Sequence, residues 1–421
     1  MSTNAPTPPV FPDAPATDPN TLRWMIGSPP PADKVIRYED GSYYRFPQWR
    51  WSFSHWRELR PTIEVSRGKE PASELTRAER TDFDAVRFSP LNSSARMTWE
   101  ESLDASYTDG IVVLHRGRIA YERYLGALTP ERSHIAFSVT KSFFGTLAAI
   151  LIDSGALDAA AKVTRYIPEL ERSGFGDATV AQVLDMTTAI DFSENYVGGS
   201  ESMLNYGVAT GFRTPPQGFA GAKSVYTFLP TIGKAGSHGE AFTYRTPNTD
   251  VVGWLIARAS GKSPGEFLSE RIWSQLGAEE HAFLQVDEQG TSLAGLSLNM
   301  RLRDLARFGE LMRLNGRFNG RQIIPAAAVE DIRRGGDREA FIKAGYATLP
   351  GWSYKRQWWV SHDDHGVFMA RGIHGQAIYV DPKAEMVIAR FASHPLAGNS
   401  LLDPTSLPAY RAIADHLLQA S

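Results

Sequence analysis

The stretch Phe137-Ser138-Val139-Thr140-Lys141-Ser142 opens the most apolar helix-like run of this 421-residue chain, which continues to Gly155. Apolar side chains within the run recur at helical spacing, at Val139, Phe143, Leu147, Ile150 and Leu151. The spacing predicts a helix that ends at Gly155, because glycine commonly follows the last turn of a helix. A helix that is apolar on most sides is usually buried, so we expect this one to lie in the core.

Ser138 and Lys141 lie three residues apart and therefore face the same side of the first helical turn. A serine hydroxyl is a poor nucleophile until a base removes its proton. A lysine amine held in a dry site loses its charge more easily and can accept that proton. The helix N-terminus adds unpaired N–H groups where an oxyanion would form. One helical turn would thus supply a nucleophile, a base and part of an oxyanion hole.

A Ser-x-x-Lys sequence also arises by chance, roughly once or twice in a chain of this length at average composition. A second copy is present at Ser66–Lys69, where no apolar run follows it. We interpret that copy as a solvated loop, because it lies among charged residues, glycine and proline. The buried-helix context of Ser138 supports a catalytic role and a structural role about equally. Both interpretations therefore stay open on this context alone.

The composition narrows the function classes. The chain is 42% hydrophobic and 22% charged with a net charge of −3, which is typical of a globular protein and gives no sign of a nucleic-acid partner. The absence of cysteine excludes thiol catalysis, disulfides and cysteine metal sites. The N-terminus lacks the pattern of a signal peptide, and the longest apolar run is too short to span a membrane. We expect a cytoplasmic protein with a small-molecule substrate, no membrane partner, no metal and no cofactor.

Strand patterns lie towards both ends of the chain, and helix and loop patterns lie between them. Residues 111–124 predict a hairpin, and further strands are predicted at 356–360, 375–380 and 385–391. We predict an α+β fold in which helices flank an antiparallel sheet and a helical domain is inserted. The predicted parts are an N-terminal tail at 1–45, a sheet domain at 46–157 and 290–421, and a helical domain at 158–289.

Three other motifs have structural explanations. Gly261–Gly265 matches a Gly-x-Ser-x-Gly nucleophile elbow, but Pro264 lacks the N–H that the elbow needs, so we reject it. His362–His365 could suggest a metal site, although four adjacent polar residues between strands more often form an exposed turn. Trp49–Arg57 interleaves tryptophan with arginine, which we interpret as a packed N-terminal lid rather than a surface that stacks on bases.

The chain resembles the serine β-lactamase and penicillin-recognising family, in its class C and esterase branch, and within it the nylon-oligomer hydrolases. The resemblance runs from about Trp49 to the C-terminal helix. The pieces that carry it occur in the family's order: Tyr121–Tyr124, Phe137–Ser142, Gly155–Asp158, Val183–Met186, Asn195–Val197, Tyr244, Asn248–Asp250, Arg303–Arg307, Arg356–Trp359 and Gly372–Gln376. The resemblance implies the same α+β fold for this chain.

The resemblance implies catalytic roles for four residues. Ser138 matches the acylated nucleophile, Lys141 its neighbouring base, and Tyr244 the tyrosine that moves protons to and from the serine and the leaving group. The backbone N–H groups of Ser138 and Ile373 match the oxyanion hole. Asn248 stands four residues after Tyr244 rather than two, which leaves its substrate role open.

The resemblance also implies substrate contacts. Tyr196 and Trp359 match residues that line the pocket. Ile373 and His374 stand where lactamases have Lys-Thr, so the cation that holds a lactam carboxylate is missing. Gly207 matches the position of an aspartate that meets a substrate ammonium group.

Together these residues predict a serine hydrolase that cleaves carboxylic esters, linear amides of the aminohexanoate type, or both, through an acyl-enzyme on Ser138. Two alternatives stay open on the same fold: a binding or sensor module that is acylated without turnover, and a hydrolase of cell-wall peptides or β-lactams. A homodimer is also left open.

Overall fold

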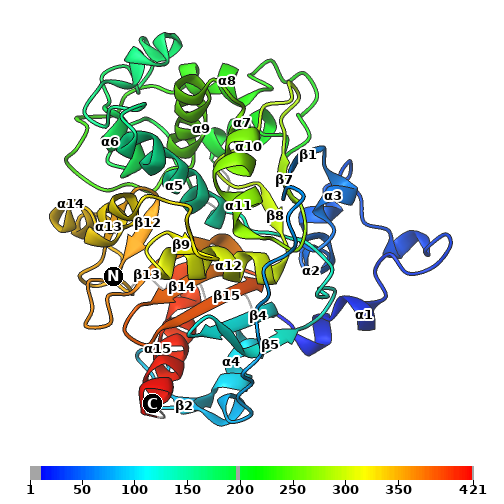
Figure 1. Ribbon diagram of the computed structural model, residues 1–421. Coiled ribbons are helices and arrows are strands. Elements are labelled where there is room, and N and C mark those ends of the chain that lie inside the picture. Colours follow the sequence, from blue (N-terminus) through cyan, green and yellow to red (C-terminus); the bar gives the residue numbers. More distant parts are fainter. Residues whose placement is uncertain (1–10, 196–199, 420–421) are drawn as a thin grey trace, which may run out of the picture.

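The computed structural model describes residues 11–195 and 200–419, and a seven-stranded antiparallel sheet lies at its centre (Figure 1). Its strands in spatial order are β11 (Ser353–Lys355), β12 (Trp358–Val360), β13 (Phe368–Gly372), β14 (Gln376–Asp381), β15 (Met386–Ala392), β4 (Thr108–His115) and β5 (Arg118–Tyr124). The pairing of β15 with β4 joins strands from the two ends of the chain. This arrangement confirms the predicted hairpin and the predicted antiparallel C-terminal strands.

Helices cover both faces of this sheet: α5 (Val139–Asp153) and α12 (Leu302–Arg313) on one, α4 (Trp99–Ala105) and α15 (Asp403–Gln419) on the other. Alternate side chains of a strand point to opposite faces. Accordingly, Val112 and Leu114 of β4 join the core beneath α5 and α12. Ile111 and Val113 join the core beneath α4 and α15. The sheet is therefore buried on both faces.

A smaller sheet of four strands lies beside the large one. It consists of β1 (Thr62–Val65), β7 (Ala282–Gln285), β8 (Leu298–Met300) and β6 (His134–Ile135). Two short antiparallel pairs complete the strands, β2 (Arg87–Phe88) with β3 (Met97–Thr98) and β9 (Arg317–Phe318) with β10 (Arg321–Gln322). The small sheet matters for the site because its strand β6 leads into α5.

Helices fill the middle of the chain: α6 (Val180–Leu184), α7 (Glu201–Ala209), α8 (Val225–Phe228), α9 (Pro247–Ser260), α10 (Pro264–Leu268) and α11 (Ser274–Leu276). The remaining helices are α1 (Pro19–Leu22), α2 (Trp49–Ser52), α3 (Trp56–Leu59), α13 (Ala326–Arg334) and α14 (Arg338–Ile342). We retain the inserted helical domain at 158–289 as a proposal. Strand β7 lies within that range yet pairs with β1 and β8, which lie outside it.

Helix α5 lies between the sheet and the middle helices and contacts both α9 and β13 (Figure 1). Every residue from Val139 to Leu151 is buried. Gly155 follows the helix with a φ of +74°, which agrees with the predicted stop. A Cβ at Gly145 would lie 2.0 Å from the carbonyl oxygen of Arg356. Only glycine at this position lets the helix backbone approach the turn between β11 and β12.

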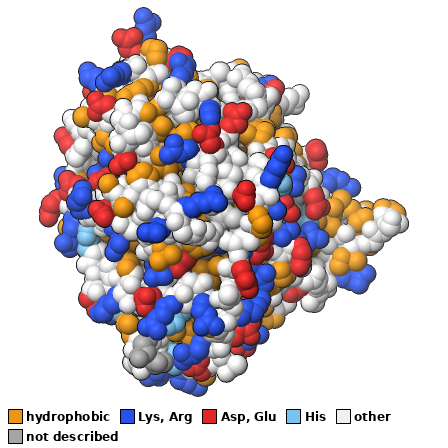
Figure 2. Space-filling view, viewed as in Figure 1, with side chains coloured by type: hydrophobic (Ala, Val, Ile, Leu, Met, Phe, Trp, Pro, Cys, Tyr) orange, Lys and Arg blue, Asp and Glu red, His pale blue; other side chains and the backbone are white. Residues whose placement is uncertain are grey.

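The N-terminal residues contribute to the core as well as to the surface. Ile36 and Tyr43, which fall in the predicted tail, are each 2% exposed and join an aromatic cluster with Phe53, Trp56 and Phe137. The segment around α1 projects from the side of the molecule (Figure 1). The face in Figure 2 shows acidic and basic side chains interspersed, in keeping with the small net charge. The tail thus reaches Phe137, the residue before Ser138.

Gly145→Ala tests the close approach of α5. Alanine is the better helix former, but its methyl group would meet a backbone oxygen that cannot move without shifting the turn. We expect the free energy of unfolding to fall by about 2–4 kcal/mol, measured by urea denaturation. Gly233→Ala is the matched control, because that exposed glycine has an ordinary 3.7 Å contact, and its effect should stay within about 0.5 kcal/mol. Equal effects of the two substitutions would contradict this interpretation.

Candidate active site

Ser138 is the N-cap residue of α5 and is 6% exposed. The segment before it is anchored by two backbone hydrogen bonds: Ile135 donates to Phe53 at 2.9 Å, and Ala136 donates to Leu298 of β8 at 2.8 Å. Lys141 Nζ lies 2.9 Å from Ser138 Oγ, within hydrogen-bond distance. The structure therefore joins the predicted nucleophile and base on the first turn of a buried helix.

The residue before the nucleophile has an unusual backbone conformation. Phe137 has a φ of +44°, in the left-handed region that bulky residues rarely adopt. Its ring is held by aromatic neighbours, with centroids 4.8 Å from Phe53 and 5.6 Å from His374. Packing fixes a conformation that costs local free energy, as is common next to reacting groups. The sequence gives no signal for this conformation.

The amine of Lys141 lies in a buried polar environment. Besides Ser138, it donates to the carbonyl oxygen of Gly295. The Gly295 N–H in turn donates to the carboxylate of Asp250 at 3.0 Å, and Tyr206 donates to the same carboxylate at 2.6 Å. Burial lowers the pKa of Lys141 to about 8, opposed by the negative charges of Glu194 and Asp250. Burial also raises the pKa of Asp250 to about 6. A modest proton affinity suits the predicted role of Lys141 as a base that takes a proton and returns it.

Tyr244 lies just before α9 and reaches the same serine. The Lys141 ammonium is 5.2 Å from the centroid of its ring. Burial raises the pKa of the Tyr244 phenol well above its usual value, while a side-chain hydrogen bond with Ser138 acts in the opposite direction. The Trp359 ring stacks on Tyr244 with centroids 5.6 Å apart and planes at 27°. The structure thus places Tyr244 beside both Ser138 and Lys141, which the sequence alone could not do.

Glu194 is a site residue that the sequence reasoning missed. Its carboxylate accepts hydrogen bonds from the backbone N–H and from the hydroxyl of Thr246, the latter at 2.6 Å. Its negative charge raises the pKa values of both Lys141 and Tyr244. The available signal was its place directly before Asn195, within the motif that carries the resemblance. Glu194 favours the protonated forms of Lys141 and Tyr244, the two groups that are predicted to move protons.

Ile373 begins a short 3₁₀ turn, η9 (Ile373–Gly375), directly after β13. A Cβ at Gly372 would lie 2.7 Å from the carbonyl oxygen of Ala136, so glycine lets the end of β13 touch the backbone that leads to Ser138. Ile373 and Ser138 both line the same cavity. The local packing brings the backbone segments that carry Ser138 and Ile373 together at one cavity, and their service as an oxyanion hole stays a prediction.

The cavity beside Ser138 has a volume of about 570 Å³. Aromatic and apolar side chains make up much of its wall: Tyr44, Trp49, Phe137, Met203, Tyr206, Phe212, Leu296, Ile373, Pro395, Leu396 and Leu401. The N-terminal lid contributes Trp49, whose indole N–H donates to the carbonyl oxygen of Ser393 at 3.1 Å. A largely apolar wall with a few polar groups is typical of a small-molecule site.

Only some of the predicted substrate-binding residues line the cavity in the described structure. Gly207 on α7 and His374 line the cavity. Both nitrogens of His374 already face protein partners, the hydroxyl of Tyr44 at 3.0 Å and the carbonyl oxygen of His394 at 2.7 Å, and burial lowers its pKa to about 4. Trp359 is not part of the cavity wall formed by the described residues and instead packs on Tyr244. Tyr196 lies outside the described residues.

Asn248, whose role was open, is buried and satisfied by protein groups. Its Oδ1 accepts from the Thr188 hydroxyl at 2.7 Å, and its Nδ2 donates to the carbonyl oxygen of Arg245 at 3.1 Å. The Thr188 contact holds the start of α9 against the segment after α6, and the Arg245 contact is local to the residues that lead into α9. Asn248 is therefore a structural residue in this conformation.

Comparison with known proteins identifies the family. The family model described as beta-lactamase matches residues 100–403, which is more than half of the chain and includes Ser138, Lys141 and Tyr244. The chain belongs to the β-lactamase family. It is 36% identical over 355 residues to a 6-aminohexanoate-dimer hydrolase from Paenarthrobacter ureafaciens, an alignment that covers 84% of this chain and 88% of that protein. The family and this relative make the chain a serine hydrolase of the esterase and amidase type.

Solved structures share the fold. A Bacillus anthracis protein that carries the provisional name 6-aminohexanoate-dimer hydrolase superposes with a TM-score of 0.83 at 30% identity, covering 91% of this chain and 99% of that one. A family VIII carboxylesterase superposes with a TM-score of 0.55 at 16% identity, covering 82% of this chain and 100% of that one. The second likeness shows the fold alone, and the predicted α+β β-lactamase-like architecture is confirmed.

The competing motifs have structural roles. Ser263 caps α10 by accepting from the backbone N–H of Glu266, and Gly261 ends α9 with a φ of +69°. His365 of the polar turn is buried and bonds to Asp381 at 2.7 Å. Among residues 11–195 and 200–419, no three histidine or carboxylate side chains group as a metal site, and no helix is long and apolar enough to cross a membrane.

The lowered pKa of Lys141 predicts the pH dependence of the reaction. Only the neutral amine can take the proton from Ser138, and its fraction falls about tenfold per pH unit below pH 8. We expect kcat/KM for a neutral ester to rise with pH up to about 8 and then to level off. An unperturbed lysine would instead give a rise that continues beyond about pH 10. Initial rates with p-nitrophenyl butyrate from about pH 6 to 11, corrected for spontaneous hydrolysis, separate these two outcomes.

Proposed function

We propose that this β-lactamase-family enzyme hydrolyses short carboxylic esters, and more slowly linear amides, through an acyl-enzyme on Ser138. The observation that carries the proposal is the 2.9 Å contact between Lys141 Nζ and Ser138 Oγ at a buried helix N-terminus. The buried phenol of Tyr244 completes the set of groups that such a reaction needs.

In the first half-reaction, Lys141 takes the proton of Ser138 while Oγ bonds to the substrate carbonyl carbon. The carbonyl oxygen gains negative charge and is held by the N–H groups of Ser138 and Ile373. The tetrahedral intermediate collapses and the bond to the leaving group breaks, while Tyr244 donates its phenol proton to the leaving oxygen or nitrogen and takes up the proton held by Lys141. In the second half-reaction, water attacks the acyl carbon, its proton follows the reverse path, and the acid is released with Ser138 restored.

The residues at positions 373 and 374 argue against β-lactams as the main substrate. Ile373 and His374 replace the Lys-Thr pair of lactamases, and burial keeps His374 neutral at physiological pH. Neither residue therefore supplies the cation that holds a lactam carboxylate. The remaining alternative, an acylated sensor, differs in kinetics, because a sensor releases one equivalent of leaving group and then stops.

Ser138→Ala tests the nucleophile. Removing the hydroxyl should lower kcat for p-nitrophenyl butyrate by several orders of magnitude. Because Ser138 is a small N-cap residue whose side chain makes no capping bond, the variant should keep the circular dichroism spectrum and unfolding midpoint of the wild type. Wild-type turnover in this variant would refute the assignment of Ser138.

The same assay separates the alternatives. Continuous turnover by the wild type, at many equivalents per enzyme, excludes a sensor, whereas a single burst excludes the hydrolase. Nitrocefin hydrolysis as fast as ester hydrolysis would favour the β-lactam alternative. A chelator should leave the rate unchanged, since the proposed steps use no metal.

Substrate preference depends on the wall near Gly207. The resemblance places an aspartate there in enzymes that meet a substrate ammonium group, and glycine supplies no such charge. The related Paenarthrobacter ureafaciens protein is named for the 6-aminohexanoate dimer, which carries an ammonium group. An ester needs less help than an amide, because an alkoxide or phenoxide leaves more easily than an amine. We therefore place esters ahead of aminohexanoate amides.

Gly207→Asp tests this preference. A single ion pair in a partly buried site contributes on the order of 1–3 kcal/mol, which is roughly tenfold to a hundredfold in rate if it is made in the transition state. We expect the wild type to favour p-nitrophenyl butyrate over the linear aminohexanoate dimer in kcat/KM. The variant should gain on the dimer relative to the ester. A wild type that prefers the dimer, or a variant with no gain, would contradict the proposed role of position 207.

The cytoplasmic location and the homodimer stay hypotheses. Cell fractionation tests the first, and light scattering of the purified enzyme tests the second.

A further inference from the structure

The cavity beside Ser138 contains an arginine that the mechanism does not use. Arg213 lies in the wall of this cavity and is exposed to solvent. It follows α7 by a turn at Gly211, and its backbone N–H donates to the carbonyl oxygen of Gly207 at 2.8 Å. This hydrogen bond anchors the backbone of Arg213 to the C-terminal end of α7.

The stem of Arg213 lies over Gly207. A Cβ at position 207 would be 3.0 Å from both Cγ and Cδ of Arg213. The glycine therefore leaves the space that the arginine stem occupies, and a side chain at 207 would require this flexible stem to shift by a few tenths of an ångström. Position 207 therefore has no anionic side chain, and the cationic side chain of Arg213 lies against it instead.

The guanidinium group of Arg213 has no acidic partner among the described residues. No ion pair joins Arg213 to an aspartate or glutamate within residues 11–195 and 200–419, and the other segments contain no acidic side chain. Its electrostatic neighbours are the hydroxyl groups of Tyr43 and Tyr44, whose pKa values are raised by burial and lowered by the charge of Arg213. The cavity thus presents a positive charge to a ligand.

The same cavity wall shows which part of a substrate faces Arg213. Tyr244, which serves the leaving group, lines a second hollow of about 700 Å³ that shares Glu194 and Asn195 with the first. In the proposed mechanism the leaving group therefore extends towards the hollow at Tyr244, and the acyl chain extends into the cavity that contains Gly207 and Arg213. A charged group at the far end of the acyl chain would meet the arginine.

We propose that Arg213 is a specificity-determining residue that binds a carboxylate at the end of the acyl chain, so that the preferred substrates are monoesters or monoamides of dicarboxylic acids. This inference rests on the proposed function, because it needs turnover at Ser138. A planar guanidinium group matches a carboxylate in geometry as well as in charge. Hydrolysis then forms the Ser138 ester of the diacid, releases the alcohol or amine, and adds water to give the free dicarboxylate.

The test compares three 4-nitrophenyl esters of matched length. Their acyl chains end in a carboxylate, in the methyl ester of that carboxylate, or in an ammonium group. Each of the three end groups is tested at three chain lengths, those of glutaric, adipic and suberic acid. The readout is the ratio of kcat/KM for the anionic ester to that for its neutral partner. Because Arg213 is exposed, we expect a ratio of about three- to tenfold for at least one chain length. The ratio should fall as salt is added.

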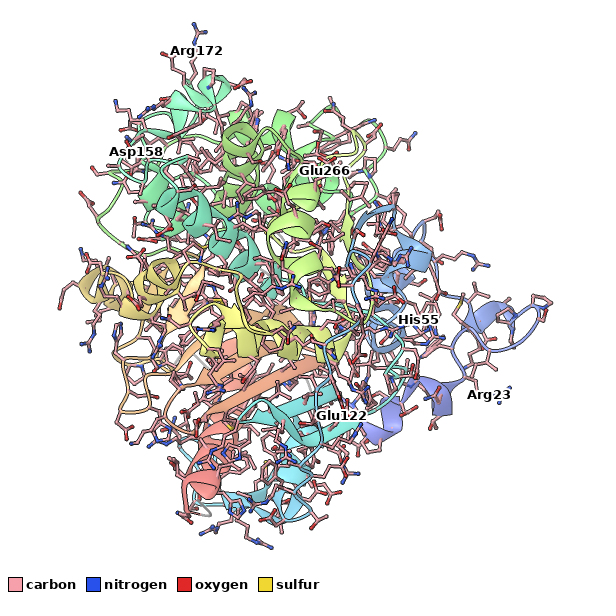
Figure 3. All side chains as sticks on the ribbon, viewed as in Figure 1. Arg23, His55, Glu122, Asp158, Arg172 and Glu266 are labelled. Atoms are coloured by element: carbon pink, nitrogen blue, oxygen red, sulfur yellow. The ribbon has the colours of Figure 1, made fainter. Side chains whose placement is uncertain are left out.

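Three variants separate charge recognition from a structural role. Arg213→Gln should reduce the ratio to about one, and Arg213→Glu should reverse it in favour of the ammonium ester. Arg172→Gln is the matched control, since this exposed arginine projects from the edge of the helical part, away from the sheet (Figure 3), and the ratio should stay at the wild-type value.

Two results would overturn the inference: a wild type without preference for the anionic ester at any length, or a preference that persists in Arg213→Glu. These differ from a failure of the proposed function, in which none of the three esters is turned over in a manner that depends on Ser138.

Discussion

A lysine amine buried beside a serine hydroxyl is the constraint on which the site depends. Moving an ammonium group out of water costs several kcal/mol unless it is paired, and the chain reduces this cost in two ways. Gly295 offers a carbonyl oxygen to Lys141, and Asp250 and Glu194 supply negative charge nearby. Burial still dominates, because the pKa of Lys141 lies below that of a free lysine. The amine is thus held close to the point at which it can exchange a proton near neutral pH.

The geometry of the site follows from packing between elements that are distant in sequence. Ser138 and Lys141 come from α5, Tyr244 from the segment before α9, and Ile373 from the end of β13. Close backbone contacts at Gly145 and Gly372 set how α5 and β13 meet their neighbours. Backbone atoms at such contacts cannot yield as a flexible side chain can, so α5 holds Ser138 and Lys141 rigidly. Tyr244 lies in the irregular segment that leads into α9 and is held there by packing against Trp359.

The structural features that depend on residues close together in the sequence could be predicted from the sequence. The helical period predicted α5, and two strand-like runs around the Arg116-Gly117 turn predicted the 111–124 hairpin. The spacing of Ser138 and Lys141 predicted that both lie on one side of the first helical turn, where their side chains are in contact. Contacts between residues that only the tertiary fold brings together could not be predicted from the sequence. The stacking of Trp359 on Tyr244, the hydrogen bonds of Glu194 to Thr246 and the left-handed conformation of Phe137 all join or strain residues through long-range packing. The strand β13 was also missed, because its five residues are all buried and show no clear alternation of apolar and polar side chains.

The site contains a negative charge at Glu194, near Lys141 and Tyr244, and a positive charge at Arg213 in the cavity wall. Glu194 acts on Lys141 and Tyr244, so its charge bears on the proton transfers that every substrate requires. Arg213 lies in the cavity wall against Gly207, and neither residue makes a hydrogen bond with the reacting groups in the described structure. Substitution at positions 207 and 213 can therefore change the charge that the enzyme accepts on its acyl chain without altering the proton path. The proposed selection of anionic acyl groups by Arg213 would let one β-lactamase-type scaffold change the acyl charge that it accepts while Ser138, Lys141 and Tyr244 stay the same.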